Sequence, residues 1–99
     1  MTMLFVTYAG DTGTRFDRDY YTNTHLPLVL EAWGPHGLET AAAFFPASDG
    51  VGTIAVCVCR FQNEAAIRSA INSPQTERVM ADVKHFTDAK PTQSRAVPL

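Results

Sequence analysis

The chain of 99 residues has little basic charge and no long apolar run. Eight lysine and arginine residues stand against ten acidic residues, which gives a net charge of −2. The basic residues do not gather in a stripe, so nucleic acid is not an expected ligand. The longest apolar runs have the length of a strand, short of the ~20 residues that a membrane helix needs. The N-terminus lacks the basic start of a signal peptide, so we expect a cytoplasmic protein.

The sequence has only two cysteines and three histidines, and their spacing matches no metal or redox motif. Cys57 and Cys59 are separated by one residue within an apolar run. In a strand they would share one face with Cα atoms roughly 6 to 7 Å apart, which suits a disulfide poorly. We therefore interpret them as small apolar residues of a packed strand. His25, His36 and His85 lack the close spacing of a zinc site, so no structural metal is expected.

Several common catalytic motifs are absent as well. The sequence has no glycine-rich phosphate loop, no dinucleotide fingerprint and no recognisable motif around a serine or cysteine nucleophile. Its length predicts one domain over residues 1–99. A domain of this size buries its apolar surface incompletely on its own, so contact with a partner would stabilise it.

The segment from Phe16 to Leu28 carries the strongest local signals. Asp17 can accept the free backbone donors of a helix that begins near residue 18. Phe16 and Tyr21 then have the spacing of a hydrophobic staple. Pro27 removes a backbone donor and disfavours helical geometry in the residue before it, which predicts a kink at residues 24–26.

His25 lies at this predicted kink. It shares one helical face with Tyr21, Leu28 and Ala32, so its imidazole should face whatever the helix packs on. One interpretation is a partly buried histidine that hydrogen-bonds a carbonyl freed by the kink. The other is an acid, a base or a polar anchor in a cleft, because an ordinary imidazole pKa of about 6.5 allows proton exchange near neutrality.

The remaining elements follow from apolar runs and turn residues. Strands are predicted over residues 3–9, 38–45, 52–61 and 91–97, the last with the prolines and polar residues of a sheet edge. Gly34 is expected to end the first helix in the left-handed conformation. Asn63 can cap a second helix, and Ser73-Pro74 can restart it with Val79, Met80 and Val83 buried. The predicted order is βαββαβ.

The first and third strands are apolar on both faces. Met3, Phe5 and Ala9 alternate with apolar neighbours, and so do Val56 and Val58. A sheet with one face in water should instead alternate apolar with polar residues. Two helices cover only one face, so a second copy of the chain is the simplest cover for the other, and we predict a homodimer.

Five blocks of the sequence form a recognisable pattern: Phe16-Asp17, Tyr20-Tyr21, His25-Leu26-Pro27-Leu28, Trp33-Gly34-Pro35 with Gly37-Leu38, and His85-Phe86-Thr87-Asp88 with Pro91. In these blocks the chain resembles the EthD family, named for ethyl tert-butyl ether degradation. The resemblance implies an α+β, ferredoxin-like βαββαβ fold with an antiparallel four-stranded sheet. It also implies that two subunits form a dimeric α/β barrel.

A βαββαβ unit brings the end of the first strand, the start of the first helix and the connector before the last strand to one end of the subunit. His25 is the candidate catalytic residue there, and Trp33 lines the deeper end of the pocket or fills the core. Core packing is the alternative for each aromatic. Asp88 either orients His25 or caps a turn with Thr87, and the turn is the favoured role. The candidate ligand-binding residues are Tyr8, Tyr21, Trp33, Phe86 and Asp88.

These residues predict a pocket for a small hydrophobic or oxygenated organic compound. The first hypothesis is a cofactor-independent isomerase, cyclase, lyase or oxygenase in catabolic or biosynthetic metabolism, with His25 moving a proton. The second is a non-catalytic binding or accessory protein of a monooxygenase system. The third is haem binding through His25, as in some dimeric α+β barrels, although the sequence shows no motif for it.

Overall fold

The computed structural model describes residues 1–99 and is built around one antiparallel sheet of four strands. The strands are β1 (Thr2–Gly10), β2 (Leu38–Phe44), β3 (Gly52–Phe61) and β4 (Pro91–Ala96). They lie in the order β2-β3-β1-β4, so β4 occupies an edge, as its prolines predict. This topology confirms the predicted ferredoxin-like α+β fold.

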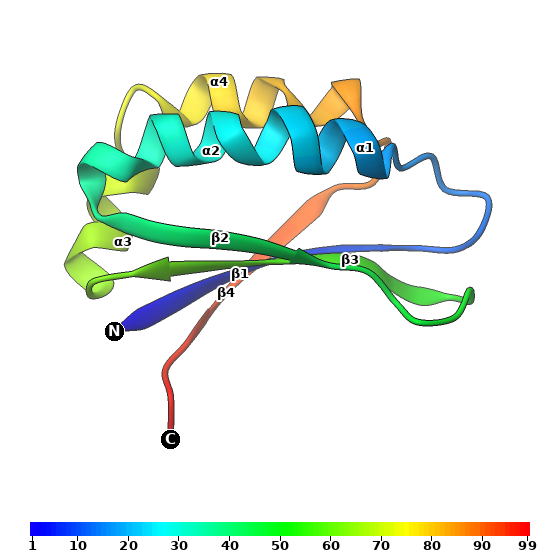
Figure 1. Cartoon of the computed structure of the whole chain (residues 1–99), viewed down its shortest axis with the longest axis horizontal. Helices are drawn as coiled ribbons and strands as arrows, with labels where there is room; N and C mark the ends of the chain where they lie inside the picture. The colour runs from blue at the N-terminus through cyan, green and yellow to red at the C-terminus, as the bar shows by residue number, and fades with distance from the viewer.

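The long helical layer lies over one face of this sheet, and the short helix that directly follows β3 lies at the end of the sheet (Figure 1). The first helical stretch contains α1 (Arg18–Tyr20), a π-helical turn (Tyr21–His25), α2 (Leu26–Trp33) and a 3-10 turn (Gly34–His36). The second contains α3 (Glu64–Ile71), α4 (Thr76–Ala81) and a 3-10 turn (Val83–His85). No helix has both the length and the apolar character that crossing a membrane requires.

The start of the first helix follows the signals in the sequence. The Asp17 side chain accepts a hydrogen bond of 3.0 Å from the backbone N–H of Tyr20, which satisfies one of the free donors of the first turn. The rings of Phe16 and Tyr21 lie 5.1 Å apart, so the predicted staple forms as well. Together these contacts fix the angle at which the chain enters the helix.

The predicted kink before Pro27 is replaced by a π-helical turn. The backbone N–H of Leu26 donates to the carbonyl of Tyr21, five residues earlier, so the helix is widened here. Pro27 then occupies the first turn of α2, where its missing donor costs little. The helix therefore continues through residues 24–26, and His25 ends the widened turn.

Three predicted details are wrong. Gly34 has a right-handed backbone, because Pro35 fits the first turn of a 3-10 helix, and Gly37 takes the left-handed conformation instead, with φ of 106°. The restarted helix begins at Thr76 rather than at Ser73-Pro74. Met80 is 42% exposed, whereas Val79 beside it is buried as predicted.

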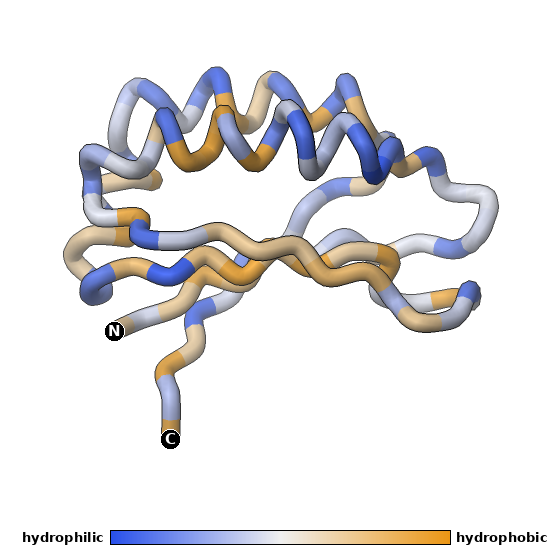
Figure 2. The backbone as a smooth tube through the Cα atoms, viewed as in Figure 1, coloured by the Kyte–Doolittle hydropathy of each residue, from blue (hydrophilic) through white to orange (hydrophobic).

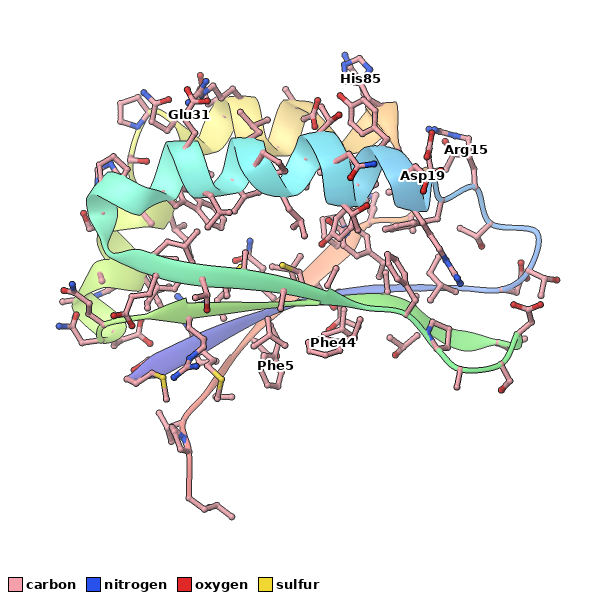
Figure 3. All side chains as sticks on the ribbon, viewed as in Figure 1. Phe5, Arg15, Asp19, Glu31, Phe44 and His85 are labelled. Carbon is pink, nitrogen blue, oxygen red and sulfur yellow. The ribbon has the colours of Figure 1, made fainter.

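The core lies between the helices and the sheet (Figure 2). Alternate strand residues point into it, so β3 buries one side of its apolar run. The opposite face of the sheet carries no helix. Phe5 and Phe44 point away from the helical layer (Figure 3), and Phe44 is 58% exposed. The helix-facing residues that are fully enclosed include Leu4, Tyr8, Ala55, Cys57, Cys59 and Phe61.

Candidate functional site

His25 forms the centre of a buried polar network. Its side chain is only 4% exposed, and its Nδ1 lies 2.9 Å from Oδ2 of Asp82. The other carboxylate oxygen of Asp82 accepts a hydrogen bond of 2.7 Å from the hydroxyl of Tyr20. The network joins the π-helical turn to the residue that ends α4. It thereby fixes the orientation of the imidazole.

The charges of this network follow from burial and hydrogen bonding. Burial lowers the pKa of His25, and the hydrogen bond and charge of Asp82 oppose this shift without cancelling it. Burial alone would raise the pKa of Asp82, but hydrogen bonds from Tyr20 and His25 outweigh it, so the net shift is downward. Near neutral pH a neutral His25 therefore donates its Nδ1–H to an ionised Asp82.

This tautomer leaves the lone pair of Nε2 free. Nε2 has no hydrogen-bond partner within the protein. Every enclosed side-chain nitrogen or oxygen has a partner, so Nε2 is not enclosed. Nε2 is therefore open to the cavity that His25 lines. An imidazole held by a carboxylate on one side and open on the other can accept a proton.

Aromatic rings hold the imidazole in place. The ring of Tyr21 stacks on it with ring centroids 5.4 Å apart. The centroid of the Phe86 ring lies 4.6 Å from that of the imidazole. Phe86 is fully buried and does not line the cavity, so it supports His25 from behind. Tyr8 packs edge-on against both Tyr21 and Phe86.

The cavity beside His25 lies between the helical layer and the sheet. It is mostly apolar, and no lysine, arginine, aspartate or glutamate lines it. Its volume is about 20 Å³, which is room for about one water molecule. Of the predicted ligand-binding residues, Tyr8, Tyr21 and Trp33 line it. The other lining residues are Val6, Leu26, Val29, Cys57, Cys59, Val79, Met80, Val83, Pro91 and Gln93.

This arrangement occurs in a chain whose sequence matches a known domain. The sequence profile of the EthD domain matches residues 11–90. The chain belongs to the EthD family. No curated protein matches the chain.

Solved structures share the fold of this EthD protein. An EthD-like protein from Ralstonia eutropha has a TM-score of 0.81 at 20% identity, over 96% of this chain and 88% of that chain. An EthD family protein from Bacillus halodurans has a TM-score of 0.76 at 17% identity, over 100% and 99%. SnoaB from Streptomyces nogalater, a cofactor-independent oxygenase, has a TM-score of 0.64 at 10% identity, over 98% and 92%. At these identities the likeness shows the fold alone.

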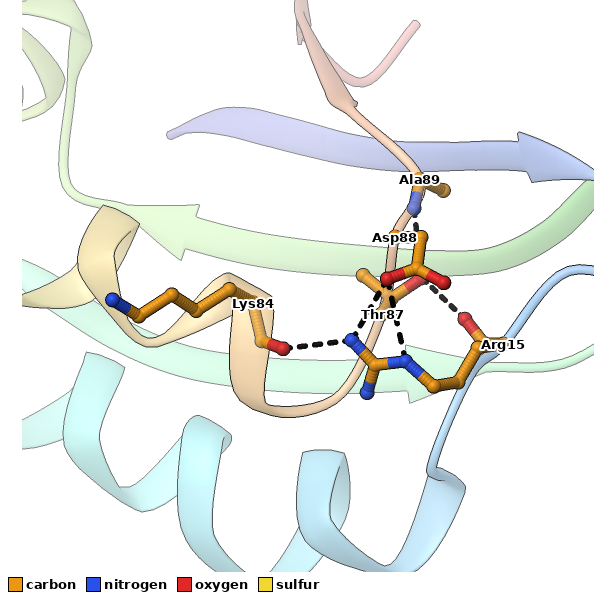
Figure 4. A network of polar contacts seen from close by, with 5 residues as sticks. All are labelled: Arg15, Lys84, Thr87, Asp88 and Ala89. Atoms are coloured by element: carbon orange, nitrogen blue, oxygen red, sulfur yellow. Dashed lines mark hydrogen bonds and ion pairs between the residues drawn. The ribbon is translucent and has the colours of Figure 1, made fainter.

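Asp88 has neither of the roles considered for it. Its side chain is 73% exposed and pairs with Arg15 at 3.0 Å, and Arg15 also donates to the carbonyl of Lys84 (Figure 4). The hydroxyl of Thr87 shapes the turn instead, because it accepts from the N–H of Ala89 and donates to the carbonyl of Arg15. Asp88 therefore links the connector before β4 to Arg15 at the protein surface and does not contact His25.

Asp82 is the functional residue that the sequence-based prediction missed. It lies between Val79 and Val83, on the face of the second helical stretch that packs inward. An acidic residue at buried helical spacing is a detectable signal, because burying a carboxylate is costly unless it has a partner. Its pairing with His25, 57 residues away in sequence, depends on how the two helical stretches pack. No three histidine, cysteine, aspartate or glutamate side chains gather closely enough to hold a metal ion.

Acid is expected to destabilise this EthD protein through the His25–Asp82 pair. The pKa of His25 is lowered in the folded state from 6.5, so below that pH the unfolded chain binds a proton that the folded chain excludes. The lowered pKa of Asp82 adds stability that is lost as the pH falls further, below 3.8. Urea unfolding should show a free energy of unfolding that declines as the pH falls from about 6.5 towards about 4. In His25→Gln this decline should become shallower, and equal slopes in the two proteins would contradict the assignment.

Proposed function

We propose that this EthD protein binds a small uncharged organic compound beside His25, and that His25 transfers a proton during its conversion. The observation that carries the proposal is the Asp82-held imidazole with Nε2 open to an apolar cavity. A buried, oriented base in a cavity is the arrangement expected of proton-transfer enzymes.

The lining supports an uncharged compound with an oxygen acceptor. No charged side chain lines the cavity, so a carboxylate or phosphate would be buried without a partner. Burial raises the pKa of both Tyr8 and Tyr21, so both hydroxyls keep their protons and serve as donors. A carbonyl or ether oxygen is a suitable acceptor for such hydroxyls.

The chemistry follows from the two nitrogens of the imidazole. Nε2 takes a proton from an activated C–H or O–H bond, and the Nδ1–H bond to Asp82 stabilises the imidazolium that forms. Return of the proton to another atom completes an isomerisation, a cyclisation or an elimination. Deprotonation is also the first step in cofactor-independent oxygenation of electron-rich substrates. The fold that the chain shares with SnoaB supports including this last class.

A compound larger than water needs the cavity to open. Met80, Val83 and Pro91 line both this cavity and a wider outer groove of about 440 Å³. Methionine is flexible and partly exposed at this position. Movement of the Met80 side chain would join the two spaces into a pocket of the size that small-molecule sites usually have.

We also propose that a second copy of the chain covers the bare face of the sheet. Phe5, Val58 and Ala42 are register partners across β1, β3 and β2, and Val56 pairs with Phe44 beside them. Register partners share one face of a sheet, so these side chains lie on the face where Phe5 and Phe44 point away from the helices (Figure 3). A symmetric pair would bury the same patch on both subunits.

A role in binding without chemistry rests on the apolar lining alone, and one experiment separates the two functions. The purified protein is screened by thermal shift against uncharged lactones, aromatic ketones, polyketide-like compounds and ethers, each beside a carboxylate analogue of similar size. We expect stabilisation by members of the uncharged set only. Each stabilising compound is then incubated with the protein, and the mixture is analysed by mass spectrometry. Conversion supports the enzyme, stabilisation without conversion supports the binding protein, and stabilisation only by carboxylates contradicts both.

A further inference from the structure

Two thiols line the cavity and have no part in the proton transfer described above. Cys57 and Cys59 lie on the helix-facing side of β3, and both are buried. Their Sγ atoms are 3.6 Å apart, which is within hydrogen-bond distance for sulfur. Both residues line the space that His25 also lines. A molecule in the cavity would therefore lie beside both residues.

The two thiols are not equivalent. The two sulfurs share a hydrogen bond in which either can be the donor. With Cys59 as the donor, this hydrogen bond lowers the pKa of Cys57, and the same bond together with burial raises the pKa of Cys59. Cys57 is consequently the better nucleophile, and Cys59 is in position to react with whatever forms on it.

The size of the cavity selects the reagent. A volume of about 20 Å³ holds a water molecule and little more. Hydrogen peroxide, with two oxygen atoms and no charge, is among the few thiol oxidants of that size. Bulky organic hydroperoxides exceed the volume of the closed cavity and enter only when the Met80 side chain moves, and no cation lines the cavity to attract a charged oxidant. The closed cavity therefore favours hydrogen peroxide over larger oxidants of thiols.

We propose that Cys57 and Cys59 form an oxidisable thiol pair that reacts with hydrogen peroxide inside the cavity. The sulfur of Cys57 attacks one peroxide oxygen, the O–O bond breaks, and Cys57 becomes a sulfenic acid while one water leaves. The thiol of Cys59 then attacks this sulfur, an S–S bond forms, and a second water leaves. Two thiols are oxidised by two electrons, and one peroxide is reduced to two waters.

The geometry permits this second step only with a local adjustment. The sulfurs must approach from 3.6 Å to about 2.05 Å, and neighbours on one face of a strand lie near the upper limit of Cα separation for a disulfide. The sequence predicted packing residues and not a disulfide, because the spacing suits a disulfide poorly; a bond formed at this spacing is strained, so thiol reductants reopen it easily. The reduced pair is the resting form, and the oxidised pair is reversible.

The experiment uses the intact wild-type protein and hydrogen peroxide. Intact mass should fall by two hydrogen atoms per chain and return after addition of dithiothreitol. Alkylation after unfolding should count no free thiols in the oxidised sample and two in the reduced one. Cumene hydroperoxide serves as the bulky comparison. For each oxidant, the rate of thiol oxidation in the folded protein is divided by the rate in the unfolded protein. We expect this ratio to be at least about tenfold lower for cumene hydroperoxide than for hydrogen peroxide.

Single serine variants assign the two roles. In Cys59→Ser, dimedone should trap a sulfenic acid on Cys57, whereas Cys57→Ser should give at least about tenfold less adduct on Cys59. Thermal melts establish that both variants are folded. Three results would overturn the proposal. The first is that hydrogen peroxide oxidises the unfolded protein while the folded wild type keeps both free thiols. The second is a dimedone adduct mainly on Cys59, and the third is disulfide-linked dimers on a non-reducing gel. The first and third need no variant.

Discussion

Replacing His25 with glutamine is expected to lower kcat by about 10²- to 10⁴-fold for a compound that the protein converts. Glutamine keeps a polar side chain beside Asp82, but it cannot take up a proton near neutral pH. The Michaelis constant should change only a few fold, because the apolar walls that bind the compound remain. Steady-state kinetics with a compound found in the thermal-shift screen would measure both constants.

Two further variants separate a base from a structural histidine. His36→Gln removes a partly buried imidazole that does not line the cavity and whose Nδ1 lies 3.0 Å from the hydroxyl of Ser69, and kcat should be unchanged. Asp82→Asn should retain part of the activity and move the acidic limb of the pH profile of kcat to lower pH. The reason is that Asp82 raises the pKa of His25, so its loss lets that pKa fall further. Unchanged kcat in His25→Gln would reduce His25 to a buried structural residue.

The parts of the site that sequence predicted are those set by local chain geometry. Asp17 and Tyr21 could be placed because a cap and a staple need only neighbouring residues. The common face of Cys57 and Cys59 follows from strand alternation, which is equally local. His25 was expected to face the packed side of its helix for the same reason, and it does so.

The parts that sequence did not predict depend on contacts between distant segments. Pairing of His25 with Asp82 requires the two helical stretches to meet, and no local signal specifies that meeting. Asp88 was assigned near the pocket from its place in the connector, but Arg15 holds it at the surface. Pro27 indicated a disturbed helix, yet whether the chain kinks or widens is decided by packing on the sheet.

Both functional proposals concern the helix-facing side of the sheet, whereas the predicted assembly concerns the other side. If the bare face pairs with a second copy, the His25 cavity of each subunit remains on the outer layer with its own helices. Catalysis and oxidation of the thiol pair then do not require the partner, although the partner stabilises the sheet that forms the floor of the cavity. A monomeric variant should therefore keep a formed site.

Placing a charge on the bare face of the sheet is expected to break the dimer. Phe44 is 58% exposed in the single chain, so Phe44→Lys should leave the subunit folded. In a symmetric pair the two lysines would be buried near each other in an apolar interface, which should weaken association at least about a thousandfold. Light scattering at micromolar concentration should report about twice 10.8 kDa for the wild type and 10.8 kDa for the variant.

A matched substitution on the helical layer provides the control. Leu30 on α2 is also an exposed apolar residue, and Leu30→Lys introduces the same charge on the face that the dimer leaves free. This variant should remain dimeric, which would show that the position of the lysine matters rather than its presence. Circular dichroism should show unchanged helix and strand content in both variants. A wild-type mass of one subunit at micromolar concentration would contradict the assembly outright, and dissociation of Leu30→Lys would move the interface to the helices.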